Sequence, residues 1–255
     1  MTFSIVIPTF NASNTIVKTL DSCVYQTFLP KEIIVIDDCS QDDSVKIVNE
    51  YMKKYKGSVE IKFDFLPKNS GPSVARNRAW DLATGEYVAF LDADDYFVSS
   101  KLEVISLILE KNKEIILLGH DYSLDDQDIH HSNDLKKIVT KDLLLKNLTT
   151  TPSVIVKKNI KERFDESMRY TEDHDLWLRI TKKYNKTYYL NRVLTTIDRP
   201  VRSKGGQSSN LWGMRKGEII MYYKYCKNNR IMLVFPLFLG FSFSKHLMKM
   251  IKGYL

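Results

Sequence analysis

Five consecutive apolar residues, Tyr87 to Leu91, are followed at once by Asp92-Ala93-Asp94-Asp95. An apolar run of this length predicts a strand buried on both faces, as in sheets covered by helices. Ligands of open α/β sheets bind at the carboxyl ends of the strands, so we expect the three carboxylates in a binding site. Neighbouring like charges repel unless a cation or hydrogen-bond donors neutralise them. A hard divalent ion that also contacts phosphate is the first candidate, and a phosphate-bearing substrate is the resulting hypothesis.

Strands and helices are expected to alternate through the first half of the chain. The apolar runs predict strands at 3–7, 32–36, 61–66 and 87–91. Apolar residues at helical spacing predict helices at 14–26, from Ser40 as the N-cap to Tyr55, and at 73–83. This order implies right-handed crossovers, and therefore an α/β fold with a mostly parallel sheet and helices on both faces.

The second half is less regular. We expect strands at 115–118 and 153–156, a polar loop at 121–134, and a helix from its cap Thr171 to Tyr184. No Gly-x-Gly-x-x-Gly follows the first strand, where Pro8-Thr9-Phe10-Asn11 stands instead, so a dinucleotide-binding redox enzyme is disfavoured.

The composition indicates a globular protein of a reducing compartment. A chain of 255 residues can bury one substantial core, with an appendage. Its three cysteines have neither metal-like nor disulfide-like spacing, and no basic segment precedes the first strand. A cleaved signal peptide is therefore not expected, and a cytoplasmic location is.

Positive charge is concentrated at the carboxyl-terminal end. Eleven Lys or Arg and one acid, Glu218, lie from Arg199 onward, a net +10, which leaves −3 for the first 198 residues. Residues 231–243 are mostly apolar but contain Pro236 and are too short to span a membrane comfortably. Lys245, Lys249 and Lys252 share one helical face.

This tail resembles a helix lying on anionic lipid, so we expect a peripheral protein on the inner face of the cell membrane. The alternative is a helical hairpin packed on the body. A division into a catalytic domain at 1–205 and a helical extension at 206–255 follows. Nucleic-acid binding is not expected, because no stacking platform is present. The lack of a multi-span region argues against a processive polysaccharide synthase.

Four segments in order resemble family 2 glycosyltransferases, and together they cover roughly residues 3–205. They are Ser4-Ile5-Val6-Ile7-Pro8-Thr9-Phe10-Asn11, Ile34-Val35-Ile36-Asp37-Asp38-Cys39-Ser40-Gln41-Asp42, the pair Asn69-Ser70-Gly71-Pro72-Ser73-Val74-Ala75-Arg76-Asn77 and Gly85 to Asp95, and Thr171-Glu172-Asp173-His174-Asp175-Leu176-Trp177-Leu178-Arg179. The resemblance implies the GT-A fold, an inverting mechanism and a nucleotide-diphosphate sugar donor, with a UDP-sugar favoured.

The resemblance also implies roles for residues on the donor side. Asp38 would hydrogen-bond the base, Arg76 would lie near the nucleotide, and the opening turn of Pro8, Thr9 and Asn11 would line the donor site. The alternatives are that Asp37 and Asp38 only cap the next helix, and that Arg76 is a surface residue.

The family's Asp-x-Asp motif falls on Asp92 and Asp94. By resemblance, Asp92 would contact the ribose or a metal-bound water, and Asp94 would bind Mn²⁺ or Mg²⁺ directly. A divalent cation stabilises the negative charge that develops on the departing diphosphate. Asp95 is assigned no role beyond capping, and in the alternative all three are solvated turn residues.

Asp173 is the candidate general base and Glu172 a residue that orients the acceptor. Inversion in one displacement needs a carboxylate that takes the proton of the acceptor hydroxyl. The alternative is that both acids only open a helix, where the dipole favours them. Arg202 and Lys204 fall in a glycine- and serine-rich loop at the place of the family's mobile lid and could clamp the diphosphate, although the family's usual histidine is absent.

The expected activity is therefore transfer of one sugar, hexosyl or N-acetylhexosaminyl, to a hydroxyl of a bacterial surface-glycan acceptor such as a lipopolysaccharide, O-antigen or capsule precursor. A catalytically silent nucleotide-sugar-binding module at the membrane is the alternative. A phosphatase of the haloacid dehalogenase type is disfavoured, because its Asp-x-Asp follows the first strand and here the motif follows the fourth.

Overall fold

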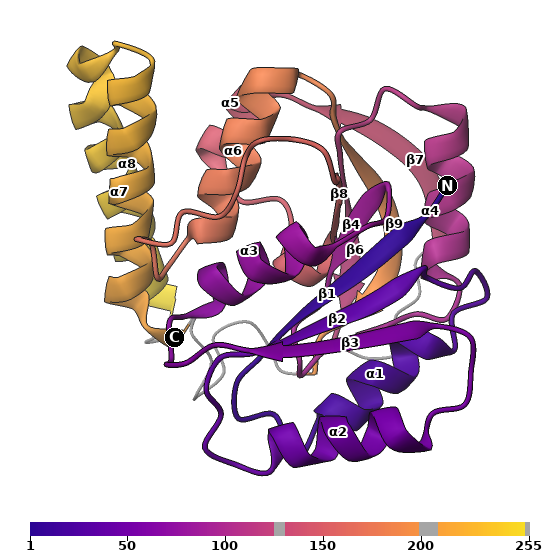
Figure 1. Cartoon of the computed structure of the whole chain (residues 1–255). Helices are drawn as coiled ribbons and strands as arrows, with labels where there is room; N and C mark the ends of the chain where they lie inside the picture. Colours follow the sequence, from indigo (N-terminus) through magenta and orange to yellow (C-terminus); the bar gives the residue numbers. More distant parts are fainter. Residues whose placement is uncertain (125–130, 199–208, 253–255) are drawn as a thin grey trace.

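The computed structural model describes residues 1–124, 131–198 and 209–252, and in them a nine-stranded sheet carries helices on both faces (Figure 1). The strand order is β3-β2-β1-β4-β8-β6-β9-β5, with β7 paired to β9 beside this path. The α/β class expected from the sequence is confirmed.

One half of the sheet is parallel and holds the four predicted strands. These are β1 (Phe3–Thr9), β2 (Glu32–Asp37), β3 (Glu60–Phe65) and β4 (Tyr87–Phe90). The helices between them are α1 (Ile16–Val24), α2 (Ser44–Lys54) and α3 (Pro72–Leu82). Since all four strands run the same way, their carboxyl ends meet at one edge.

The other half is mixed. Antiparallel pairs join β4 to β8 and β8 to β6, β6 then pairs parallel with β9, and β5 and β7 both pair antiparallel with β9. Its strands are β5 (Tyr96–Phe97), β6 (Leu117–Ser123), β7 (His131–Ile138), β8 (Val154–Lys157) and β9 (Thr187–Thr196). Its helices are α4 (Lys101–Lys111), α5 (Thr140–Leu145), the short η1 (Thr151–Ser153) and α6 (Glu172–Tyr184).

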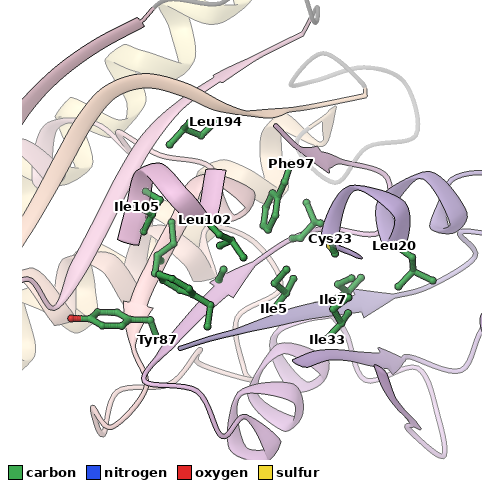
Figure 2. Close-up of a cluster of buried hydrophobic side chains, with 14 of the residues drawn as sticks. Ile5, Ile7, Leu20, Cys23, Ile33, Tyr87, Phe97, Leu102, Ile105 and Leu194 are labelled. Atoms are coloured by element: carbon green, nitrogen blue, oxygen red, sulfur yellow. The ribbon is translucent and has the colours of Figure 1, made fainter. Parts of the chain in front are cut away.

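Alternate residues of the central strands enter two separate hydrophobic clusters. Ile5 and Ile7 of β1 face the cluster beneath α1, α2 and α4, much of which Figure 2 shows, whereas Val6 faces the cluster beneath α3 and α6. The second cluster includes Trp80 of α3 and Trp177 of α6. Burial on both faces is the reason that these strands are continuous apolar runs.

Two local predictions are wrong. Helix α2 begins at Ser44 rather than after Ser40, whose hydroxyl instead donates to Asp37 at 2.5 Å. The stretch 121–134 is not one polar loop, because β6 continues to Ser123 and β7 begins at His131. Among the described strands β7 pairs with β9 alone, and polar, charged residues are typical of a strand in such an edge position.

The carboxyl-terminal segment forms a helical hairpin at one side of the molecule (Figure 1). It consists of α7 (Leu211–Asn228), the short η3 (Met232–Val234) and α8 (Phe235–Lys252). Met221 and Tyr222 of α7 are buried in the cluster beneath α3 and α6, and the ring of Phe238 stacks on Tyr222 at 4.7 Å. The hairpin therefore packs on the body. No helix among the described residues is both long and apolar enough to cross a bilayer. The predicted boundary at 205/206 lies outside the described residues.

Candidate active site

A cleft at the carboxyl ends of β1, β2 and β4 brings together seven of the predicted site residues. Its volume of about 530 Å³ is in the range of sites for small-molecule ligands. The seven are Pro8, Thr9, Asn11, Asp38, Arg76, Asp92 and Asp94, and further lining residues include Asn69, Gly71, Pro72, Arg169 and Tyr170. Glu172 and Asp173 are not in this lining, and Arg202 and Lys204 lie outside the described residues.

The turns that follow β1 and β2 are tied to each other. The Asn11 backbone N–H donates to Ser40 Oγ at 2.9 Å, and Asn11 Oδ1 accepts from the Gln41 N–H at 2.8 Å. Both oxygens of Asp37 accept hydrogen bonds from Ser40. Asn11 and Cys39 adopt left-handed φ values of 50° and 64°, which are uncommon for residues other than glycine.

Asp38 holds the loop that leads into α3. Its two carboxylate oxygens accept the backbone N–H groups of Ser70 at 2.6 Å and Gly71 at 2.8 Å. Gly71 precedes the helix with φ at 93°, a conformation that a side chain would disfavour. Neither Asp37 nor Asp38 bonds to α2, so the interpretation that they only cap this helix is wrong. Asp38 is buried in the cleft wall.

The loop that carries Asp92 and Asp94 is held from below by α1. The hydroxyls of Thr15 and Thr19 both donate to the Ala93 carbonyl, at 2.7 Å and 3.0 Å, and Thr19 also donates to the Asp95 carbonyl. These contacts fix the backbone of the loop, and Asp92 and Asp94 line the cleft.

The chemistry of this loop fits a hard divalent cation. Burial, followed by the nearby charges of Asp92 and Asp94, raises the pKa of Asp95 to about 8, and a cation beside these carboxylates would relieve their mutual repulsion. The described residues contain no group of three or more potential metal ligands, so Asp92 and Asp94 would supply two oxygens and a phosphate or water the others. Mg²⁺ is commonly bound in this way, and Mn²⁺ accepts the same oxygen ligands.

Arg76 connects this loop to α6. Its Nη2 donates to Asp92 Oδ1 at 2.8 Å and its Nη1 to Glu172 Oε1 at 3.1 Å. Burial alone would lower the pKa of Arg76, but the two carboxylates outweigh burial and raise it. The interpretation of Arg76 as a surface residue is wrong, because its side chain is buried. Its guanidinium joins the cleft to the acidic helix.

The residues Tyr170–Asp173, which we call the α6 turn, present the acidic pair. Asp173 Oδ2 accepts from Asn147 Nδ2 at 3.1 Å, and Asp173 Oδ1 accepts the His174 N–H at 2.7 Å. Burial raises the pKa of Glu172 to about 7, with Arg76 opposing the shift. Thr171 does not cap α6 with its side chain: its φ is 64°, and its hydroxyl donates to the Met214 carbonyl of α7 at 3.2 Å.

Two glycines of α7 allow the hairpin to approach the α6 turn closely. A Cβ added at Gly213 would lie 2.5 Å from the Tyr170 ring, and one at Gly217 would lie 2.3 Å from the Tyr170 carbonyl oxygen. Asn210, the cap of α7, donates to the Tyr170 hydroxyl at 3.0 Å. The start of the helix that carries Asp173 is therefore packed directly on the hairpin.

Several residues of the site were not predicted. Arg169 and Tyr170 lie three and two residues before the predicted acidic pair, so their position alone could have suggested them. Thr15 and Thr19 are four residues apart beside the apolar stripe of α1, a detectable spacing that places both hydroxyls on one side of the helix. Asn147 reaches Asp173 from 26 positions earlier and has no signature in the sequence.

The sequence profile of glycosyl transferase family 2 matches residues 4–159, which is 156 of the 255 residues. The chain belongs to glycosyl transferase family 2. The match includes the seven cleft residues, and the α6 turn lies beyond it.

Two curated relatives resemble this family 2 glycosyltransferase over most of their length. TuaG of Bacillus subtilis (strain 168), whose name assigns it to teichuronic acid biosynthesis, is 32% identical over 229 residues, which cover 86% of this chain and 86% of TuaG. The UDP-Glc:alpha-D-GlcNAc-diphosphoundecaprenol beta-1,3-glucosyltransferase WfgD of Escherichia coli is 30% identical over 183 residues, covering 71% of this chain and 70% of WfgD.

Solved structures share the fold of this family 2 glycosyltransferase. Residues 1–349 of S. aureus TarS, in complex with UDP-GlcNAc, superpose with a TM-score of 0.71 at 22% identity, over 96% of this chain and 73% of that one. The mannosyltransferase PcManGT of Pyrobaculum calidifontis, in complex with GDP-Man and Mn²⁺, gives a TM-score of 0.69 at 16% identity, over 97% of this chain and 74% of that one. The GT-A fold implied by the sequence is confirmed.

Proposed function

We propose that the protein is an inverting glycosyltransferase that moves a single sugar from a nucleotide-diphosphate sugar to a hydroxyl of a bacterial surface-glycan precursor. The observation that carries the proposal is the link through Arg76, which joins Asp92 in the cleft to Glu172 beside Asp173. A donor site and a candidate base are thereby held next to each other.

The donor would lie in the cleft along Pro8, Thr9, Asn11 and Asp38. Asp38 would hydrogen-bond the base of the nucleotide. Burial of Asp38 between two backbone N–H groups keeps its carboxylate fixed in the wall. A UDP-sugar carrying a hexose or an N-acetylhexosamine is the favoured donor, because WfgD is named for UDP-Glc and TarS was solved with UDP-GlcNAc.

Asp94, with Asp92, would hold Mn²⁺ or Mg²⁺ against the diphosphate. When bound, the ion stabilises the negative charge that the diphosphate gains as it departs. The Mn²⁺ complex of PcManGT supports this assignment through the shared fold. Asp92 is also bonded to Arg76, so its remaining oxygen is the one available to the ion or to the ribose.

Asp173 would act as the general base. The acceptor oxygen bonds to the anomeric carbon while the bond from that carbon to the diphosphate breaks, and the acceptor's proton passes to Asp173. The two hydrogen bonds that Asp173 accepts, from Asn147 and from the His174 N–H, hold its carboxylate in one orientation. Glu172, held by Arg76, would orient the acceptor, and Arg202 and Lys204 would clamp the diphosphate.

The test separates donor binding from turnover. Purified protein is heated with UDP and Mn²⁺, and UDP release is followed with UDP-glucose, UDP-galactose and UDP-N-acetylglucosamine. We expect Asp94→Asn to lose the thermal stabilisation. Asp173→Asn should keep the stabilisation but lose turnover by roughly 10²–10⁴-fold, the usual contribution of a general base. Asp81→Asn, a surface change in α3, is the control for both.

Normal turnover in Asp173→Asn would reject the base assignment. Stabilisation of the wild type without turnover on any donor and lipid-linked acceptor would instead favour the silent binding module. Retention of full stabilisation by Asp94→Asn would reject the cation site.

The acceptor is proposed to be a glycan or a lipid-linked glycan, which WfgD's name supports. A lipid-linked acceptor requires access to a membrane, so we propose that the protein acts in the cytoplasm, peripherally on the inner face of the cell membrane. We also keep, as part of this proposal, the division into a catalytic part at 1–205 and a membrane-associating extension at 206–255.

A further inference from the structure

The exposed hydrophobic side chains of this protein are concentrated on the hairpin. Of the eighteen large hydrophobic residues exposed among the described residues, nine lie between Trp212 and Met248. This segment is about one-seventh of the chain. Single exposed apolar residues are normal, but a concentration of this kind marks an interaction surface.

The exposed side chains follow one stripe along each helix. On α7 they are Trp212, Lys216, Tyr223 and Lys227, which a period of 3.6 residues places on one face. On α8 Phe243 and Leu247 are four residues apart, and Leu237 and Met248 lie on the adjoining part of the same exposed side, with Leu237 73% and Phe243 50% exposed. The opposite stripe of each helix, which includes Tyr222 and Phe238, forms the contact between them and with the body.

The exposed charges of the hairpin all have one sign. Residues 211–252 contain eight Lys or Arg and one acid, Glu218. Glu218 is buried and bonded to Arg215, Ser242 and Lys245. The exposed ions are therefore cations, Lys216, Lys227 and Arg230 among them.

One of the three lysines of the face predicted from the sequence is turned inward. Lys245, expected at the lipid surface with Lys249 and Lys252, turns inward to Glu218 and is only partly exposed. The side chains of Lys249 and Lys252 lie outside the described residues. We therefore look for a docking face on the outer stripes of α7 and α8, whose side chains are described.

We infer that these stripes, with Leu233 between the helices, form a docking face for the surface of an anionic phospholipid bilayer. Leu233, 97% exposed, and the α8 stripe supply apolar side chains for the acyl boundary. Trp212 and Tyr223 suit the interface, and the cations match anionic headgroups. A second copy of the chain fits less well, because two such faces would bring like charges together.

The face begins at the edge of the cleft. Trp212 neighbours Gly213, which packs on the ring of Tyr170, a residue of the cleft lining. A protein docked by this face would hold the α6 turn close to the bilayer, where a lipid-linked acceptor would arrive. The inference builds on the proposed placement at a membrane, and its test does not depend on sugar transfer.

The test is flotation of the full chain with lipid vesicles. We expect binding to vesicles of equal parts phosphatidylglycerol and phosphatidylcholine, little binding to phosphatidylcholine alone, and weaker binding in high salt. Phe243→Glu and Leu247→Glu should each reduce binding to the anionic vesicles at least tenfold. Each of Lys216→Glu and Lys227→Glu should reduce it about fivefold or more, the effect of a basic group near such a surface. Leu107→Glu on α4, exposed to a similar extent at 54%, should change nothing.

Three results would overturn the inference. The first is equal binding to both kinds of vesicle, and the second is unchanged binding by Phe243→Glu and Leu247→Glu. The third is that the vesicles bind none of the protein, while sedimentation without lipid shows a dimer that Phe243→Glu dissociates. Thermal stabilisation by UDP and Mn²⁺, measured on the same variants, reports the donor site separately. If the protein does not bind vesicles but is still stabilised by UDP and Mn²⁺, the docking inference is rejected and the proposed function is not.

Discussion

On one side of Arg76 lies a wall built from the ends of β1, β2 and β4, and on the other lies the α6 turn. The wall, comprising Pro8–Ala12, Asp37–Ser40 and Asp92–Asp95, is held mainly by bonds from neighbouring strand ends and from α1. The α6 turn is held by Asn147 from earlier in the chain and by α7 from later in it.

This difference teaches that the two sides of the cleft depend on different parts of the molecule. The wall belongs to a parallel sheet whose strands are buried on both faces, so the core itself fixes it. The α6 turn projects from the sheet and depends on the hairpin. Changes within the hairpin should therefore disturb the base and, apart from Tyr170 at the edge of the cleft, spare the donor site.

The largest effect is expected where the two sides are joined. Arg76→Met leaves Asp92 and Glu172 without their buried cation, and breaking a buried ion pair costs roughly 3–5 kcal/mol of unfolding free energy. Arg78→Met on the same helix removes only an exposed pair with Asp64, and should cost less than about 1 kcal/mol. Urea denaturation measures both. Equal losses would mean that the link does not stabilise the fold.

Removing a buried acid from the wall and removing one from the α6 turn should change the pH dependence of the free energy of unfolding in different ways. The pKa of Asp95 is raised from 3.8 in the unfolded state to about 8 in the folded state. Its contribution to the free energy of unfolding is therefore full below pH 3.8 and is lost as the pH rises through 8. The pKa of Glu172 is raised from 4.5 to about 7, so its contribution to the free energy of unfolding is lost between these two pH values. Without divalent ions, the wild type should lose several kcal/mol of unfolding free energy across these ranges, because a pKa difference of one between the folded and unfolded states corresponds to about 1.4 kcal/mol.

Asp95→Asn should remove its own share of this loss, which begins near pH 3.8 and is the share that continues above pH 7, whereas Glu172→Gln should remove only a share below pH 7. The free energy of unfolding is measured by urea at a series of pH values in the presence of a chelator. If both variants keep the slope of the wild type, the buried acids do not titrate in this range.

A substitution in the hairpin tests the dependence of the α6 turn directly. Gly217→Ala would place a methyl group against the Tyr170 carbonyl, and we expect a loss of about 2 kcal/mol because backbone cannot yield easily. Turnover should fall while stabilisation by UDP and Mn²⁺ persists. Gly240→Ala in α8 is the matched control: nothing lies within 4 Å of its added Cβ, and it should stabilise by about 0.5–1 kcal/mol. Loss of UDP binding in Gly217→Ala would contradict the separation of the two sides.

The same contrast explains what could be predicted from the sequence. The wall was predictable because each of its acids directly follows an apolar run, and parallel strands place such residues at one edge. The role of Arg76 as a link was not predictable, since nothing in its helix indicates that Glu172, 96 positions later, faces it. Thr171 reads as an N-cap, and only its packing on Met214 reveals a left-handed residue bonded to another helix.

The smallest effects concern two residues in the same strained conformation, one on each side. Cys39 in the wall and Thr171 in the α6 turn both have φ at 64°. A side chain in this region costs roughly 1–2 kcal/mol, and glycine removes that cost but adds about 0.5–1 kcal/mol of backbone entropy. Cys39→Gly should therefore stabilise by about 0.5 kcal/mol, because its sulfur accepts only a weak contact from Gln41.

Thr171→Gly relieves the same strain but also loses the hydroxyl bond to Met214, which is worth about 1 kcal/mol. It should therefore be neutral or destabilising, and turnover should fall because the α6 turn is no longer tied to α7. Thermal denaturation of the two variants side by side checks the sign. If Thr171→Gly stabilises as much as Cys39→Gly and keeps full turnover, the hydroxyl bond to Met214 contributes nothing, and the α6 turn is held on α7 by the close approach of the two glycines and by Asn210.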